Sequence, residues 1–475
     1  MEEAETVTLI DPEGDTKGLN TGLGYLAGSL IQNGYTVNVI DLNNRRDNAL
    51  TRINSALNVS KYIGISIKTF TLRSAVEIIK QIDKKDRILM VGGPHITLDP
   101  KNFLEENNKV DYGVIYEGEK TTLELIGGKP INDIKNVVYR EGNEIIINEN
   151  KDYLTNFIND LDSLPFPNYD VFDSLPLDKR IDIYPLVTSR GCPFPCTYCS
   201  VGKVIGKIWR ARSPQNIIEE LFYAKEKYKS TKFEILDDDF TLSVPRAKEI
   251  CQKMIDEKVN MEWSCSNGIR ADRLDEELLD LMKTSGCKSI TIGIESLVPE
   301  VFDKINKKEK IEQIENAIQL AKKKKIKING FFIIGLLGST FELDKKSLDR
   351  ALKLGLNGAL WNILVPYPKT QVYDEVINNP DVKFLSSWEE GFHFGKKPNV
   401  VFETKEYNKQ ERIKMFYLAN LRFNNYSIFV DNEDPFYKKV YDLVKIILQY
   451  DPYMLPYHAT KMSLQKISYL LSKSS

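Results

Sequence analysis

Three cysteines, Cys192, Cys196 and Cys199, lie within eight residues of the chain. Three thiolates at this CxxxCxxC spacing can hold three corners of a 4Fe–4S cube, which leaves the fourth iron without a protein ligand. A closed zinc site would need a fourth Cys or His nearby, and no such residue flanks the loop. The spacing therefore predicts an open iron–sulfur cluster, with unligated buried cysteines as the alternative.

Acidic residues occur where strands are expected to end. Asp237 and Asp238 follow one expected strand, and Glu295 ends another. At such positions carboxylates could accept hydrogen bonds from an ammonium group or from ribose hydroxyls. The alternative for each of them is an ordinary solvated loop acid.

Two series of alternating strands and helices must position these residues. The first contains short apolar runs with β-branched residues, typical of buried parallel strands, at 6–10, 36–41, 62–67, 87–91 and 112–115. Helical patterns lie between them. This order predicts an open doubly wound sheet, a Rossmann-like fold that binds ligands at the carboxyl ends of its strands.

The second series predicts six strands, at 183–188, 233–236, 261–266, 289–294, 328–334 and 359–365. Helical segments, one of them at 311–323, again separate them. Six strand–helix units are too few for a complete eight-fold barrel and predict a partial TIM-type barrel. The cysteine loop follows the first of these strands, so it should lie at the carboxyl-terminal, catalytic end of the barrel.

The expected domains are an N-terminal doubly wound domain at 1–127, a hairpin and linker at 128–182, the barrel at 183–385, and a C-terminal helical domain at 386–475. The linker contains Leu164-Pro165-Phe166-Pro167, whose prolines disfavour regular structure. Helices are expected at 409–423 and 436–448. The aromatic residues of the last domain could line an apolar or peptide-binding pocket, or form core.

Composition excludes several classes of protein. The 65 Lys and Arg nearly balance the 67 Asp and Glu, giving a formal charge of −2 and no reason to expect a nucleic-acid partner. No long apolar run or signal-like start occurs, so we expect no membrane span and a cytoplasmic location. Six cysteines are too few for a disulfide scaffold in a chain of 475 residues.

Residues 183–375 resemble the radical S-adenosylmethionine (SAM) superfamily. The resemblance rests on the cysteine loop and on short segments at successive expected strand ends. It implies that the open iron chelates SAM and that one electron cleaves the sulfonium to a 5′-deoxyadenosyl radical. Leu337 stands where the family usually has proline, and Lys369 where it usually has glycine. The SAM contacts implied are Tyr198, Asp237, Asp238, Ser266, Arg270, Glu295 and Gly335.

The first series resembles the cobalamin-binding domain found ahead of many radical SAM barrels. Its glycine-rich turns would line one rim with exposed backbone, as a large flat ligand needs. The Asp-x-His-x-x-Gly motif is absent, so we expect base-off cobalamin without a histidine ligand; the alternative is a domain that has lost its cofactor. The cobalamin contacts implied are Leu23, Gly24, Ser66, Gly92, Gly93, His95, Glu117, Gly118 and Glu119.

The resemblance as a whole implies a cobalamin-dependent radical SAM methyltransferase. One SAM would methylate cob(I)alamin, and a second would give the radical that abstracts hydrogen from an unactivated carbon of a small molecule or peptide. An external reductant of the flavodoxin or ferredoxin type would supply the electron. Two alternatives remain: oxidation, cyclisation or rearrangement without methyl transfer, and a non-catalytic cobalamin-binding module.

Overall fold

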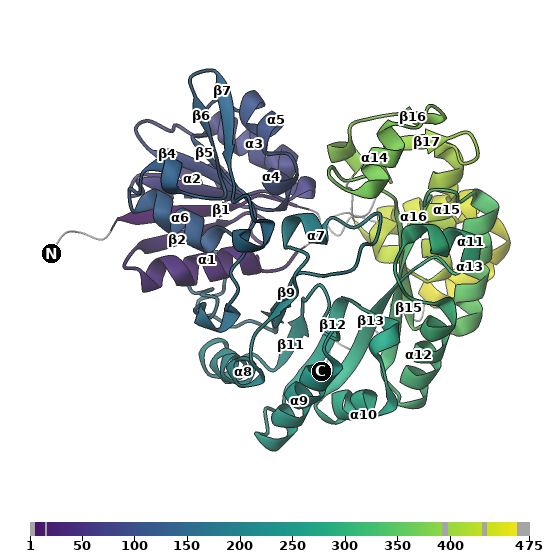
Figure 1. The fold of residues 1–475 in the computed structure, drawn as a ribbon. Coiled ribbons are helices and arrows are strands. Elements are labelled where there is room, and N and C mark those ends of the chain that lie inside the picture. Colours follow the sequence, from purple (N-terminus) through teal and green to yellow (C-terminus); the bar gives the residue numbers. More distant parts are fainter. Residues whose placement is uncertain (1–4, 15–16, 392–397, 430–434, 463–475) are drawn as a thin grey trace. The chain divides into compact units, whose positions relative to one another are not determined.

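The computed structural model describes residues 5–14, 17–391, 398–429 and 435–462 (Figure 1). The chain forms two compact units. Unit 1 contains Met1–Pro195, Cys199–Ile290 and Tyr367–Thr370, and unit 2 contains Cys196–Tyr198, Thr291–Pro366 and Gln371–Ser475. Both the cysteine loop and strand β13 (Cys287–Glu295) contribute residues to each unit.

The N-terminal part of unit 1 forms a seven-stranded sheet, whose strand order is β2-β1-β3-β4-β5-β6-β7. Its parallel strands are β1 (Thr6–Asp11), β2 (Thr36–Asp41), β3 (Tyr62–Ser66), β4 (Ile88–Gly92) and β5 (Tyr112–Val114). The hairpin β6 (Val137–Glu141) and β7 (Glu144–Asn148) pairs antiparallel with β5. The hairpin expected beside the linker therefore completes the first sheet.

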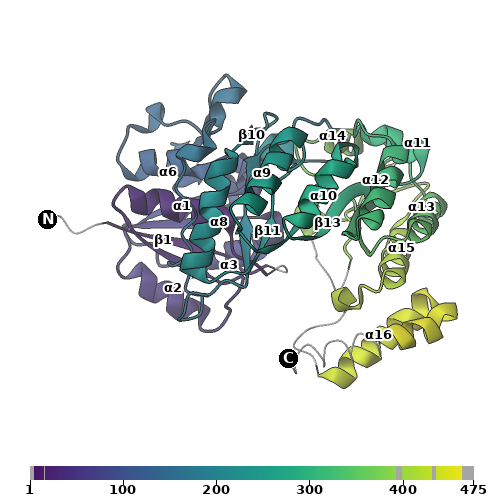
Figure 2. The same ribbon diagram turned by 90° about the horizontal axis from the view of Figure 1, so that it is seen from below.

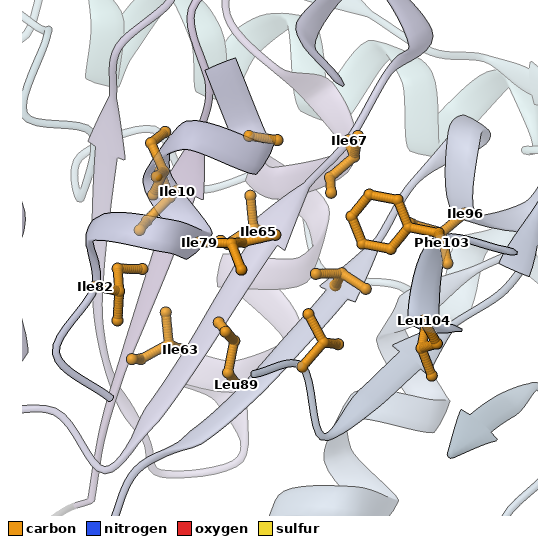
Figure 3. Close-up of a cluster of buried hydrophobic side chains, with 14 of the residues drawn as sticks. Ile10, Ile63, Ile65, Ile67, Ile79, Ile82, Leu89, Ile96, Phe103 and Leu104 are labelled. Carbon is orange, nitrogen blue, oxygen red and sulfur yellow. The ribbon is translucent and has the colours of Figure 1, made fainter. Parts of the chain in front are cut away.

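Helices cover both faces of this sheet, which confirms the doubly wound fold (Figure 2). Helices α1 (Thr21–Gln32) and α6 (Gly118–Ile126) lie on one face. The other face carries α2 (Ala49–Leu57), α3 (Leu72–Gln81), α4 (Pro94–Leu98) and α5 (Pro100–Glu106), whose apolar side chains pack on the strands (Figure 3). Because β2 and β3 flank β1, the order of connections reverses there, and ligands bind at the carboxyl ends beside such a switch point.

The linker packs along the first sheet instead of running free. The amide of Val39 in β2 donates to Val171 O at 2.8 Å, and the amide of Asp173 donates back to Val39 O at 3.0 Å. Farther along, Tyr169 packs on α1, where a Cβ added to Gly24 would lie 2.7 Å from the tyrosine ring. Close packing with the linker therefore requires a glycine at position 24.

The six strands of the second series follow one another in sequence order across one sheet. They are β8 (Ile183–Leu186), β11 (Lys232–Ile235), β12 (Glu262–Ile269), β13, β14 (Lys327–Ile334) and β15 (Gly358–Ile363). The pairs β8–β11, β11–β12 and β14–β15 are parallel. The main intervening helices are α8 (Pro214–Tyr228), α9 (Val244–Asp256), α10 (Glu276–Thr284), α12 (Ile311–Lys323) and α13 (Phe341–Leu354). This repeat confirms the expected partial barrel.

The C-terminal part of unit 2 is mainly helical. Helices α15 (Lys409–Arg422) and α16 (Phe436–Tyr450) lie where they were expected, and Tyr417 stacks on Tyr450 at 4.4 Å between ring centroids. Short strands β16 (Val382–Phe384) and β17 (Phe402–Thr404), which the sequence did not predict, pair antiparallel before them. No helix within the described ranges is both long and apolar enough to cross a membrane.

Candidate functional site

The cysteine loop is closed at its base by two short strands, β9 (Ser189–Arg190) and β10 (Arg210–Ala211). The Cys192 amide donates to Gly206 O at 3.1 Å. Gly191 has a φ of +88°, and a Cβ there would collide with Ile208 O. Only glycine therefore fits before the first cysteine. Cys192, Cys196 and Cys199 are all partly exposed, and none of the three forms a disulfide.

Arg190 ties the base of this loop to the N-terminal sheet. Its guanidinium donates to Glu117 Oε1 at 3.1 Å and to Glu119 Oε1 at 2.9 Å, and lies 5.0 Å from the centre of the Tyr25 ring. Arg210, opposite Arg190 in the β9–β10 pair, donates to both oxygens of Glu117 at 2.8 Å. The two carboxylates predicted to contact cobalamin thus hold the cysteine loop in place.

A cavity of about 350 Å³ lies in unit 1, at the carboxyl ends of the first sheet. Of the predicted cobalamin contacts, the residues that line it are Leu23, Ser66, Gly92, Gly93, Glu117, Gly118 and Glu119. Ser189, Arg190 and Asp238 contribute to the same lining from the base of the cysteine loop and the end of β11. Residues expected to serve two different cofactors therefore share one cavity.

Backbone forms part of the cavity lining because glycine stands where a side chain would not fit. Gly93 has a φ of +100°, and a Cβ there would lie 2.8 Å from Ile67 O. Gly64, which also lines the cavity, leaves no room for a Cβ beside Leu9, at 2.8 Å. This lining fits a broad, flat ligand that contacts backbone directly.

Polar residues that the sequence analysis missed lie at the switch point between β1 and β3. Asn20, the N-cap of α1, donates to Asp11 Oδ1 at 2.7 Å and to Ser66 Oγ at 3.2 Å. Lys68 lines the cavity with its Nζ 3.7 Å from the same Asp11 oxygen. Burial raises the pKa of Asp11, with Lys68 acting in the opposite direction. The sequence contained one signal for this cluster: Asn20 stands directly before the start of a helix, and Asn is a preferred N-cap residue.

Two predicted cobalamin contacts, His95 and Gly24, lie outside the cavity lining. His95 is 3% exposed, its Nδ1 lies 3.5 Å from Thr69 Oγ1, and its ring meets Phe103 edge-on at 5.8 Å. His95 is therefore a core residue and is not among those lining the cavity. Gly24 is also absent from the lining, because it packs against the linker.

The neighbouring acids after β11 have different surroundings. Asp237 accepts hydrogen bonds from the Thr188 amide at 2.6 Å, Thr188 Oγ1 at 2.5 Å and Ser189 Oγ at 2.6 Å. Its carboxylate thus joins the ends of β8 and β11, and its contact with SAM remains a prediction. Asp238 lines the cavity and accepts from the Gly191 amide at 3.2 Å. Burial raises the pKa of Asp238 to about 6.

Ser266 lies within β12, and Arg270 directly follows the last residue of that strand. The Arg270 guanidinium forms two hydrogen bonds with Asp272, at 3.0 and 3.1 Å, and stacks 3.6 Å from the centre of the Phe194 ring. Because Phe194 lies between the first two cysteines, Arg270 supports the cysteine loop from beneath. Ser266 is half-buried, with its Oγ 3.5 Å from Ser264 Oγ.

The remaining predicted SAM contacts belong to unit 2. Glu295 ends β13 with a φ of +64°, and its Oε1 lies 3.0 Å from Lys307 Nζ. Gly335 has a φ of +76° after β14, and a Cβ there would lie 2.5 Å from Arg412 Nη1. Tyr198 follows Thr197, a residue held by backbone hydrogen bonds on both sides.

The N-terminal doubly wound domain and the CxxxCxxC loop after the first strand of the partial barrel are the features expected of radical SAM proteins that carry a B12-binding domain. Residues 186–351 match the Radical SAM superfamily, and residues 10–126 match the B12 binding domain. The chain is 32% identical over 379 residues to the uncharacterized methyltransferase PH0819 of Pyrococcus horikoshii, covering 77% of this chain and 80% of that protein. The chain therefore belongs to the radical SAM superfamily, among its members with a B12-binding domain.

Two further similarities agree with this assignment. The chain is 26% identical over 418 residues to cytidylyl-2-hydroxyethylphosphonate methyltransferase of Streptomyces wedmorensis, covering 75% of this chain and 77% of that one. The solved structure of TsrM from Kitasatospora setae, with cobalamin and a [4Fe-4S] cluster bound, has the same fold, with a TM-score of 0.70, 17% identity, and coverage of 95% and 92%. The cofactors of this enzyme are those of its two families: a 4Fe–4S cluster, SAM and cobalamin.

Proposed function

We propose that this enzyme transfers a methyl group to an unactivated carbon of a small molecule, with cobalamin as the methyl carrier. The cavity of unit 1 is the observation that carries the proposal. Gly92 and Gly93 line it from the rim of the first sheet, while Arg190 and Asp238 line it from the base of the cysteine loop. A cofactor held on that rim would border the segment that leads into Cys192. Relatives named as methyltransferases support the same reaction class.

The donor sets fit the groups assigned to them. Three partly exposed thiols on one loop suit a cluster with an open iron, and we propose Cys192, Cys196 and Cys199 as its ligands. Asp238 and Glu295 offer carboxylate oxygens that suit the amino group and ribose of SAM. We assign Asp237 to positioning, because its carboxylate is already bonded to Thr188 and Ser189. The other proposed SAM contacts are Tyr198, Ser266, Arg270 and Gly335.

When bound, the cluster and SAM supply a 5′-deoxyadenosyl radical that abstracts hydrogen, and cobalamin supplies the methyl group. The chain's own residues place these groups. Arg190 and Arg210 fix the base of the cysteine loop through Glu117, and Arg270 supports Phe194 within the loop. We further propose that a flavodoxin- or ferredoxin-type protein delivers the electron and that the reaction takes place in the reducing cytoplasm. A peptide that carries such a carbon is the alternative substrate class.

The test is anaerobic reconstitution followed by metal analysis and turnover with methyl-labelled SAM. We expect about four irons and one cobalamin per chain, and label in the product. Cys196→Ala should lose the cluster and all turnover. Cys251→Ala is the matched control, because Cys251 is fully buried outside the loop, and it should retain both.

Each contrary outcome identifies the part of the proposal that is wrong. Iron without bound cobalamin would refute the role of the cavity and leave the radical chemistry standing. Unlabelled product would favour oxidation, cyclisation or rearrangement. A Cys196→Ala protein that supports its pathway as well as the wild type does would favour a non-catalytic cobalamin-binding module.

A further inference from the structure

Unit 2 contains a lysine that is almost fully buried. The side chain of Lys307 is 6% exposed, and its Nζ lies 3.0 Å from Glu295 Oε1 and 3.8 Å from Glu309 Oε2. The same ammonium donates to Gly293 O. Since Gly293 and Glu295 both belong to the end of β13, Lys307 holds the backbone and the side chain of that strand end together.

The backbone around this lysine is strained. Asn306 and Lys308, on either side of it, have φ values of +53° and +58°, and Glu295 has a φ of +64°. Residues with a Cβ rarely adopt this left-handed backbone conformation, and it persists only where the surrounding contacts compensate for its cost. Such strain gathers at functional sites, and here it lies at both ends of one ion pair.

The same loop holds the middle of the cysteine segment. The Thr197 amide donates to Ile305 O at 3.0 Å, and Thr197 O accepts from the Val372 amide at 3.0 Å. Thr197 therefore bridges two chain segments like a short strand, with Cys196 directly before it. Burial acts to lower the pKa of Lys307, but the charges of Glu295, Glu309 and Cys196 outweigh it and raise that pKa. Lys307 thus remains a cation, in a loop that hydrogen-bonds to the residue directly after Cys196.

We propose that Lys307 is a positioning residue for both the SAM site and the cluster site. Its ammonium fixes the Glu295 carboxylate through Oε1, which leaves Oε2 to accept a hydrogen bond from SAM. Its positive charge favours the reduced state of a cluster bound through Cys196, because reduction adds a negative charge nearby. The proposal rests on the proposed function and adds a residue that sets SAM affinity and cluster potential.

The experiment compares Lys307→Met with Lys308→Met in the reconstituted full-length enzyme. Lys308 is the exposed neighbour of Lys307, so its replacement removes the same charge one residue away. The measurements are iron content, the midpoint potential of the cluster by EPR-monitored titration, and SAM affinity by calorimetry. We expect Lys307→Met to lower the midpoint potential and to weaken SAM binding about tenfold or more. Lys308→Met should match the wild type in both.

A third variant, Lys307→Arg, separates charge from geometry. It keeps the positive charge, so the midpoint potential should return toward the wild-type value, while the larger guanidinium places Glu295 differently and leaves SAM binding weakened. Equal potentials and affinities in Lys307→Met and Lys308→Met would overturn the proposal. A midpoint potential of Lys307→Arg below that of Lys308→Met would also overturn the proposal. This second comparison still decides the question if Lys307→Met cannot be loaded with iron. A wild-type enzyme that binds no cluster would instead refute the proposed function.

Discussion

Replacing Arg190 with methionine should loosen the cysteine loop at its base. The side chains of Arg190, Glu117 and Glu119 are 13%, 5% and 7% exposed, so their ion pairs are screened little by water. Removing one partner of a buried pair typically costs about 3–5 kcal/mol, because the other charge is left uncompensated. Glu117 keeps its contact with Arg210 at 2.8 Å, so the loss falls mainly on Glu119. We therefore expect a cost near the lower end, about 3 kcal/mol.

The chain provides a matched control for burial. Arg180 Nε lies 2.9 Å from Asp182 Oδ1, the same separation as between Arg190 and Glu119. The side chains of Arg180 and Asp182, however, are 55% and 82% exposed. Solvent screening and the entropy of two mobile side chains limit such a pair to less than about 1 kcal/mol. Arg180→Met should therefore change stability little.

Amide hydrogen exchange over residues 186–212 measures the effect where it arises. This stretch contains β9, β10 and the hydrogen bond from the Cys192 amide to Gly206 O. A loss of about 3 kcal/mol corresponds to exchange that is roughly a hundredfold faster. Arg190→Met combined with Glu119→Gln should recover part of the loss, because no buried charge is then left unpaired. Exchange in Arg190→Met within tenfold of that in Arg180→Met would refute the reasoning.

Two further predictions concern backbone and pH. Gly93→Ala and Gly34→Ala both place a Cβ at positive φ, but only the Cβ at position 93 meets backbone, at Ile67 O. In urea unfolding, Gly93→Ala should therefore be less stable than Gly34→Ala by at least about 1 kcal/mol. It should also bind cobalamin more weakly than Gly34→Ala does. Burial raises the pKa of Asp344 to about 6, so the folded chain binds an extra proton between pH 3.8 and 6, and stability should fall by about 3 kcal/mol as pH rises through that range. Asp344→Asn should remove this part of the slope in urea unfolding measured against pH.

Helices and strands could be predicted from the sequence where apolar residues repeat with one clear period over a long segment. Helix α12 (Ile311–Lys323) has the predicted bounds, because its apolar residues repeat at helical spacing over thirteen residues. Strands β9 and β10 were missed, since two residues carry no alternation to recognise. Pairing over a long range was equally invisible: Glu117 meets Arg190 from 73 positions away and Arg210 from 93. A motif identifies a conserved type of side chain at a site, but the partner that engages it depends on the tertiary fold.

Lys369 shows how the structure accounts for a departure from the family pattern. Its φ of +67° is left-handed, which explains why glycine is usual there. Its ammonium donates to Thr97 O, 272 positions away, at 2.6 Å. A charged hydrogen bond contributes about 1.5–3 kcal/mol, enough to offset about 1–2 kcal/mol of left-handed strain. The substitution therefore preserves the turn and adds a contact to the N-terminal domain.

The charged residues around the cavity differ in whether their charge is balanced by a neighbour. Glu117 and Glu119 carry two negative charges, and Arg190 and Arg210 balance them, so this part of the lining is neutral before any ligand binds. Asp238 differs, because among the described residues it forms no ion pair, and burial raises its pKa to about 6. Because burial raises its pKa, Asp238 gains most from a cationic ligand, which would lower that pKa and release protons on binding at pH values near or below 6. In the proposed contact of Asp238 with SAM, the sulfonium and amino groups would supply that charge, whereas a ligand held against the balanced lining requires no charge of its own.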